Sequence, residues 1–169
     1  ENLIHELEKL PGIGQKMAVR IGMKLYKNRF NNLSLVDSVN SLTSLKTCIS
    51  CGAISDFETC EICSDTSRDF SKLMVVEDYL DLITLEASKE YNGVYYIIGG
   101  LISPINGVMP EDLNILGLTK RIDELLEIVS SLELIFSLNT NMEGEGTIYY
   151  IKHEIEDRIQ TGKIALSKL

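Results

Sequence analysis

The chain has 169 residues, of which 44% are hydrophobic and 24% are charged, which is the composition of an ordinary soluble globular protein. No run of about 18 apolar residues occurs, which excludes a membrane-spanning helix. The net charge of −9 is an argument against nucleic acid as a partner. The first ten residues lack the basic and apolar regions of a secretory signal, so we expect a cytoplasmic location.

The charge is unevenly distributed along the chain. Residues 1–30 hold six basic and three acidic side chains, whereas residues 70–157 hold five basic and sixteen acidic ones. A basic N-terminal segment on an otherwise acidic protein can still contact phosphates. Physiological salt screens the repulsion between phosphates and the acidic residues beyond about 8–10 Å. Nucleic acid therefore remains a candidate partner for the beginning of the chain.

The first 47 residues predict a helical region. Apolar residues recur at helical spacing in residues 3–10 and again in residues 18–25, and a third helix is expected at residues 35–45. A Pro-Gly-Ile-Gly stretch at residues 11–14 interrupts the first pattern. This arrangement predicts two helices joined by a tight turn, followed by a third.

The turn between the first two helices is a candidate phosphate site. Gly12 and Gly14 permit a sharp turn and leave backbone N–H groups uncovered where the second helix begins, at the positive end of its dipole. Four basic side chains follow on that helix, namely Lys16, Arg20, Lys24 and Lys27. The alternative is an ordinary helix–helix turn with solvated lysines. The pattern resembles the helix-hairpin-helix, a motif that binds the DNA backbone without sequence preference.

The cysteines indicate a metal site. All four lie within 16 residues, at the spacing Cys48-x2-Cys51-x8-Cys60-x2-Cys63. Each closely spaced pair can offer two thiolates from one tight turn, and two such turns complete a tetrahedral site. The alternatives are two disulfides or four free thiols, and disulfides fit a cytoplasmic chain poorly. We predict one structural zinc ion per chain, held in a closed site that performs no catalysis.

From residue 72 the sequence alternates between strands and helices. Strands are expected at residues 72–77, 94–98 and 133–138, and helices at residues 80–89, 114–131 and 147–158. Such an alternation predicts a parallel sheet covered by helices. The expected fold class is therefore a multi-module α+β chain, with a helical region, a small four-cysteine module and an α/β domain.

Three glutamates are expected at one edge of this sheet. Glu77 ends the first strand, and Glu143 and Glu145 lie in the loop expected at residues 139–146 after the third strand. Ligand sites of α/β sheets lie at the carboxyl ends of parallel strands, and three carboxylates there can hold Mg²⁺. Alternatively, Glu143 and Glu145 only complement the dipole of the following helix, and Glu77 is an ordinary loop residue.

Taken in order, these motifs are similar to those of the RecR family of recombination mediators. The matching stretches are the turn at residues 10–14, the four cysteines, and residues 75–77, 90–95, 99–104, 110–112 and 143–145. The chain departs from the family at Tyr96, where a His is usual, and at Met109, where a Gly is usual. After residue 157, only residues 158–162 and 165–169 resemble the two ends of a longer family segment.

The resemblance implies a division of the chain and a role. Residues 1–47 would be a helix-hairpin-helix DNA-binding region, 48–69 a four-cysteine zinc finger, 70–157 a Toprim domain, and 158–169 a C-terminal segment. The implied function is bacterial DNA repair, in which the protein binds DNA junctions and acts with RecO and RecF to load RecA at single-stranded gaps. The resemblance also implies a homo-oligomer, a dimer or a tetrameric ring that encircles DNA.

An enzymatic function is the alternative, namely a magnesium-dependent Toprim nuclease or a primase fragment. Catalytic relatives of the Toprim domain carry a Glu and an Asp-x-Asp pair, whereas this chain has Glu143-x-Glu145. The longer side chains displace the oxygens by one methylene, and Mg²⁺ demands near-ideal geometry. We therefore expect no enzymatic activity, and we expect the acidic cluster to contact a partner.

Overall fold

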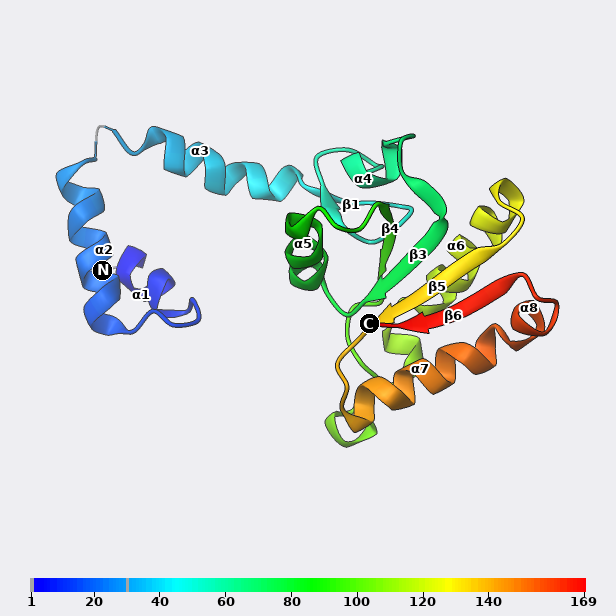
Figure 1. Cartoon of the computed structure of the whole chain (residues 1–169). Helices are drawn as coiled ribbons and strands as arrows, with labels where there is room; N and C mark the ends of the chain where they lie inside the picture. Colours follow the sequence, from blue (N-terminus) through cyan, green and yellow to red (C-terminus); the bar gives the residue numbers. More distant parts are fainter. Residues whose placement is uncertain (1, 30) are drawn as a thin grey trace. The chain divides into compact units, whose positions relative to one another are not determined.

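The computed structural model describes residues 2–29 and 31–169 (Figure 1). The chain forms two compact units, residues 1–45 and residues 46–169. The first unit is close to the predicted helical region. The second unit contains the cysteines, the whole sheet and the C-terminal residues together. The four-cysteine module and the C-terminal segment, which the resemblance sets apart from residues 70–157, therefore pack with those residues.

The first unit is helical, as predicted. It contains α1 (Asn2–Glu8), α2 (Gln15–Lys27), α3 (Leu33–Ser41) and the short 3₁₀ helix η1 (Leu42–Ser44). Ala18 is buried, and a Cβ atom added to Gly22 would lie 3.3 Å from the Ile4 side chain. The glycine therefore lets α1 and α2 approach closely. Much of the apolar surface of α2 and α3 is exposed within the described residues.

The second unit is built on a four-stranded parallel sheet (Figure 1). Its strands are β3 (Asp69–Val76), β4 (Gly93–Ile97), β5 (Leu132–Ser137) and β6 (Ile164–Lys168), in the order β4-β3-β5-β6. The first three confirm the predicted strands. The fourth comes from residues 158–169 and pairs with β5, Leu132 opposite Ile164. Unlike β4, this strand is largely exposed or half-buried and has no continuous apolar run to identify it, so only its pairing with β5 shows that it is a strand.

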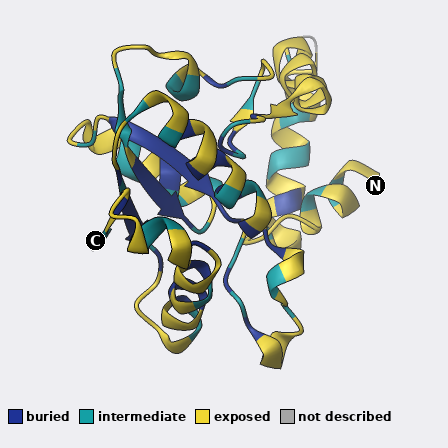
Figure 2. Cartoon of the chain, turned by 90° about the vertical axis from the view of Figure 1, so that its right-hand side faces the viewer, coloured by how far each residue is buried: buried dark blue, intermediate teal, exposed yellow. Residues whose placement is uncertain are grey.

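The two faces of the sheet are covered by different elements. Helices α6 (Ile115–Ile128) and α7 (Met142–Glu154) pack on one face, where Leu73 and Val75 of β3 point. On the other face, Met74 and Val76 pack against α5 (Tyr79–Ser88) and against the cysteine module. The buried residues are concentrated in the strands, which run through the middle of the unit (Figure 2). The cysteine module thus serves as part of a covering layer.

The remaining short elements complete the second unit. The cysteine module contains β1 (Lys46–Thr47), β2 (Ile54–Ser55) and α4 (Glu61–Ser64). Two 3₁₀ helices, η2 (Pro104–Asn106) and η3 (Pro110–Asp112), lie between β4 and α6, and α8 (Glu156–Gln160) precedes β6. Among the described residues, no helix is long and apolar enough to cross a membrane.

The start of α7 differs from the prediction. Residues 139–146 are glycine-rich and are expected to form a loop, but the helix begins at Met142 and ends at Glu154. Asn141 caps it, because its side-chain oxygen accepts a hydrogen bond of 2.7 Å from the Gly144 amide. A Cβ atom at Gly144 would collide with the Asn139 carbonyl oxygen. The glycine therefore serves close packing inside a helix and does not end it.

Substitutions at the two glycines of α7 are expected to have opposite effects. Gly144→Ala should lower the free energy of unfolding by about 1–3 kcal/mol, because the added methyl group overpacks the contact with Asn139. Gly146→Ala is the matched control, since nothing lies within 4 Å of its Cβ position. It should raise the stability by about 0.5–1 kcal/mol, because alanine favours the helix more than glycine does. Urea unfolding of both variants measures this, and equal effects would contradict the packing argument.

Candidate functional site

The cysteine module is formed by two short turns that face each other. Cys48 follows β1 and Cys51 lies three residues on, in a turn that Gly52 permits with its φ of +80°. The Gly52 amide donates a hydrogen bond of 2.9 Å to the Cys48 carbonyl oxygen. Cys60 caps the N-terminus of α4 and Cys63 lies within this helix. Each turn therefore presents two sulfurs from a fixed backbone.

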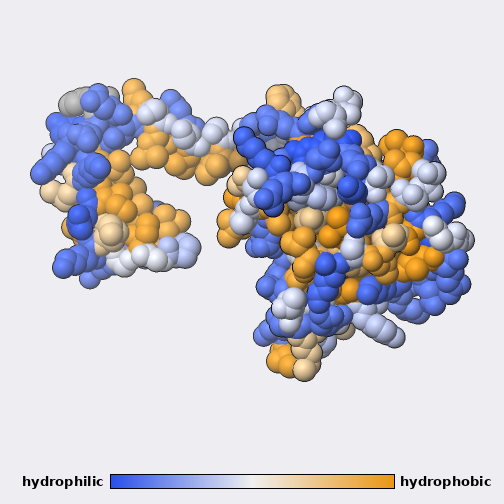
Figure 3. Space-filling model, in the orientation of Figure 1, coloured by the Kyte–Doolittle hydropathy of each residue, from blue (hydrophilic) through white to orange (hydrophobic). Residues whose placement is uncertain are grey.

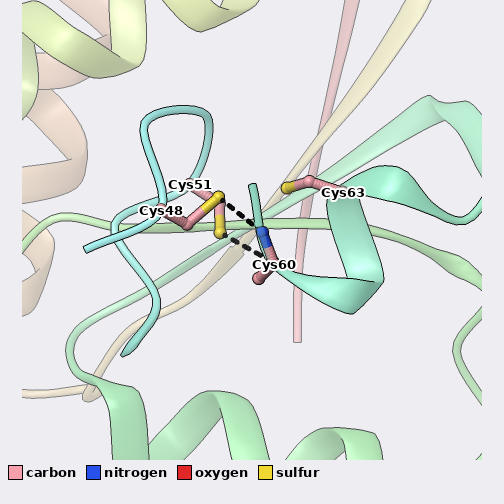
Figure 4. A group of neighbouring side chains, drawn as sticks. All are labelled: Cys48, Cys51, Cys60 and Cys63. Atoms are coloured by element: carbon pink, nitrogen blue, oxygen red, sulfur yellow. Dashed lines mark hydrogen bonds between the residues drawn. The ribbon is translucent and has the colours of Figure 1, made fainter. Parts of the chain in front are cut away.

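The four sulfurs form one cluster (Figure 4). All Sγ atoms lie within 4.8 Å of one another, and those of Cys51 and Cys60 are 3.6 Å apart. All four cysteines are free thiols, so the predicted alternative of two disulfides is not what the structure has. Four sulfurs around a tetrahedral metal at about 2.3 Å would be about 3.8 Å from one another. The cluster is therefore of the right size to hold a metal ion.

The environment of the sulfurs also suits a bound cation. Three of the four cysteines are buried, and the Cys60 amide donates a hydrogen bond of 3.3 Å to the Cys48 sulfur. The hydrogen bond between Cys51 and Cys60 raises the pKa of Cys51 and lowers the pKa of Cys60, which is the direction expected when the Cys51 thiol donates its proton. Four thiolates this close repel one another strongly, so only a cation can hold all of them deprotonated.

The three predicted glutamates do not form a comparable group. Within residues 2–29 and 31–169, the cysteine cluster is the only group of three or more His, Cys, Asp or Glu side chains close enough to hold a metal. Glu77 accepts a hydrogen bond of 2.8 Å from the Asn139 side chain. Glu143 accepts one from the Ser103 hydroxyl, and Glu145 pairs with Lys168. Each carboxylate is thus engaged by its own partner.

Glu77 and Glu143 are nevertheless neighbours at the edge where the strands end. Partial burial is the main cause that raises the pKa of Glu77, and the carboxylates of Asp81, Asp78 and Glu143 raise it further. The hydrogen bond from Asn139 opposes this change. The sequence does not identify Ser103 and Asn139 as members of this edge, because no spacing rule links them to the glutamates.

The predicted phosphate site lies in the first unit. Gly12 has a φ of +79°, and Gly14 is the extended residue that precedes α2. The four predicted basic side chains are all exposed and, within the described part of the chain, none of them forms an ion pair: Lys16, Arg20, Lys24 and Lys27. Their spacing of four, four and three residues places them on one face of the helix. We call this row the basic stripe of α2.

The fold and these sites define the class of protein. A family model described as "Toprim domain" matches residues 71–165, which form the sheet and its helices up to β6. The match reaches into the segment after residue 157, in agreement with the place of β6 in the sheet. The chain is therefore a Toprim-domain protein that carries a four-cysteine module and a helical unit ahead of this domain.

Similar proteins specify the class further. The chain is 39% identical over 167 residues to "Recombination protein RecR" of Syntrophobacter fumaroxidans, covering 97% of this chain and 81% of that protein. It is 39% identical over 159 residues to the protein of that name from Mycobacterium leprae, covering 93% and 78%. The protein of that name from Thermus thermophilus is 35% identical over 156 residues, covering 92% and 77%. The chain belongs to the RecR family of recombination proteins.

Proposed function

We propose that this protein is a DNA-binding mediator of recombination repair that acts with RecO and RecF to help load RecA at single-stranded gaps. The observation that carries the proposal is the basic stripe of α2, which is exposed and without ion pairs in the described residues. Such a row of exposed cations on an acidic protein attracts an anionic partner. Membership of the RecR family points to DNA as that partner.

The stripe suits contact with the DNA backbone. Lys16 and Lys27 are eleven residues apart on one helix, which corresponds to about 16 Å along its axis. The N-terminus of α2 adds uncovered amide groups and the positive end of the helix dipole. Phosphates are recognised by such features whatever the base sequence. We infer binding at junctions of single and double strands, without base preference.

We propose zinc as the metal of the cysteine cluster, one ion per chain. Four sulfur ligands in tetrahedral arrangement are typical of structural zinc sites. Zinc held in this way has no open coordination position, so Cys48, Cys51, Cys60 and Cys63 would staple the module and not activate water. The amide of Cys60 would help orient the ligands by its hydrogen bond to the Cys48 sulfur.

We propose that the protein is not an enzyme. Magnesium-dependent cleavage needs carboxylates that converge on the ion, whereas Glu77, Glu143 and Glu145 are each engaged by a different side chain. The alternative, a Toprim nuclease or primase fragment, would need these hydrogen bonds to be exchanged for metal ligation. We propose that this acidic edge instead contacts another protein.

We further propose that the protein works as a homo-oligomer, a dimer or a tetrameric ring around DNA. The first unit has a groove of about 540 Å³ lined by apolar side chains of α2 and α3, among them Tyr26, Val36 and Val39. Apolar side chains gather visibly over these helices (Figure 3). An apolar surface of this kind on a soluble protein marks a contact with another chain or chain segment.

The double variant Glu143→Gln, Glu145→Gln is expected to weaken binding to RecO or self-assembly. Both residues lie in the first turn of α7, so each substitution also costs about 0.3–1 kcal/mol of helix-dipole stabilisation. Zinc content and fold should be retained, because both side chains lie outside the core. A pull-down with RecO and the solution mass with and without gapped DNA measure the effect.

The matched control is Glu90→Gln, Glu127→Gln, which removes the same charge from exposed positions elsewhere in the second unit. It should bind and assemble like the unmodified protein. A cleavage assay on gapped DNA with added magnesium tests the alternative function. Strong cleavage by the unmodified protein that is lost in the Glu143, Glu145 variant would show that the protein is a nuclease. It would contradict the proposal that the protein is a non-enzymatic mediator.

A further inference from the structure

The second unit has a groove between the cysteine module and α5. Two hollows of about 250 Å³ and about 490 Å³ adjoin there. They share four lining residues, which are Glu61, Ile62, Tyr79 and Leu82, so they form one continuous depression. We call it the module–α5 groove. It adjoins the sulfur cluster at Cys60, and it shares no residue with the basic stripe or with the edge that holds Glu143.

The groove has an apolar floor that remains accessible. Leu82 is buried, and Ile62 and Tyr79 are half-buried. Phe57 lines one end with 70% of its surface exposed, and Ile83 lines the other with 42% exposed. A single exposed apolar side chain is ordinary on a protein surface, whereas several beside one hollow favour the burial of an incoming apolar group.

The rim of the groove is acidic. Four carboxylates line it, which are Asp56, Glu61, Asp65 and Glu86, against the single cation Arg68. Arg68 donates a hydrogen bond of 3.0 Å to Glu86 and lies 3.7 Å from Asp65, so its charge is already shared by two acids. Asp56 and Glu61 are exposed and form no ion pair within the described residues. The groove therefore attracts cations and repels phosphate.

A buried hydroxyl lies next to the Arg68–Glu86 pair. Tyr95 is 1% exposed, and its hydroxyl faces the Glu86 carboxylate. Burial raises the pKa of Tyr95, and the nearby Glu86 carboxylate raises it further.

We propose that the module–α5 groove binds a basic segment of a partner protein, with an apolar side chain seated between Phe57 and Leu82 and Lys or Arg side chains paired with Asp56 and Glu61. The acidic rim favours a protein partner over nucleic acid, because a phosphate backbone would meet three excess negative charges there. This site is independent of the proposed DNA contact at α2. An experiment can therefore contradict one of the two proposals without contradicting the other.

The test uses a labelled synthetic peptide in which one leucine is flanked by lysines, together with the same peptide carrying glutamates and a single-stranded oligonucleotide. Asp56→Asn, Glu61→Gln should weaken binding of the lysine peptide about fivefold to tenfold, since two ion pairs are lost. Glu127→Gln, Asp157→Asn removes the same charge elsewhere and should leave binding unchanged. Fluorescence anisotropy at low salt measures each affinity, and zinc content verifies that the module remains folded.

A steric variant tests the groove without altering its charge. Ala87→Trp fills the α5 end of the groove and should also weaken binding of the lysine peptide. Thr84→Trp is the control, because Thr84 lies on the same helix but does not line the groove. This variant should bind the lysine peptide as tightly as the unmodified protein does. The proposal is overturned if the lysine peptide does not bind, if the glutamate peptide binds equally well, or if the groove variants leave its affinity unchanged. It is also overturned if these variants weaken oligonucleotide binding, because the groove would then be a nucleic-acid site.

Discussion

Chelation of the metal, or Cys48→Ser, is expected to destabilise the second unit as a whole and not the cysteine module alone. Cys48, Cys51 and Cys60 belong to the same buried cluster as Met74 and Tyr95 of the sheet. The Ile97 amide, at the end of edge strand β4, donates a hydrogen bond of 2.9 Å to the Cys51 carbonyl oxygen. Loss of the module would therefore uncover part of one face of the sheet and free the end of β4.

The expected effect is large. Structural zinc contributes about 10–16 kcal/mol of binding free energy to small modules, whereas a whole domain is stable by about 5–15 kcal/mol. The unit should lose its cooperative thermal transition on treatment with a chelator. Hydrogen exchange should accelerate at Ile97 earlier than at the amides of β5, which pairs with a strand on each side.

Metal analysis and the control variant Thr66→Ala, at an exposed position beside the module, complete the experiment. The control should keep one zinc per chain and the unmodified unfolding transition. A protein purified without zinc, or a Cys48→Ser variant with full zinc content and stability, would contradict the assignment. An accelerated exchange confined to residues 46–65 would contradict the coupling to the sheet while leaving the metal site intact.

DNA binding should weaken about 10- to 30-fold at 0.15 M salt in the variant Lys16→Ala, Arg20→Ala, because two phosphate contacts are lost. The logarithm of the affinity should fall linearly with the logarithm of the salt concentration. The slope should shrink by about 0.7–0.9 for each contact removed. Titration of a gapped DNA over a series of salt concentrations measures both quantities.

The matched control is Lys120→Ala, Lys163→Ala, which removes two exposed cations from the second unit. It should leave both the affinity and the salt slope close to those of the unmodified protein. A preference for one base sequence, or an affinity that does not respond to salt, would contradict a backbone contact. Equal losses in the two variants would assign the effect to overall charge and not to the basic stripe of α2.

The sequence by itself determined the features that depend on local spacing. The paired cysteines at positions 48, 51, 60 and 63 predict a four-sulfur cluster, because two tight turns fix the ligands within a few residues. Helices α1 and α2 and strands β3, β4 and β5 follow from apolar periodicity in the same way. The order of the motifs also led to the RecR family, which the similar proteins confirm.

The tertiary structure alone decided which distant segments meet. Glu143 and Glu145 appear in sequence as part of a glycine-rich loop, but packing of Gly144 against Asn139 draws them into the first turn of α7. There Glu143 accepts a hydrogen bond from the Ser103 hydroxyl, and Glu145 forms an ion pair with Lys168. These contacts span from about 20 to 40 residues of chain, so no local pattern reports them.

Contacts between segments that are distant in the sequence also explain the boundaries of the second unit. The spacing of the cysteines sets their module apart from the sheet, and the resemblance to the RecR family sets residues 158–169 apart from it. In the folded chain, the module covers part of one face of the sheet, and β6 extends its edge beside β5. A short segment gains its stability from the surface that it covers, and that surface exists only once the distant strands have paired.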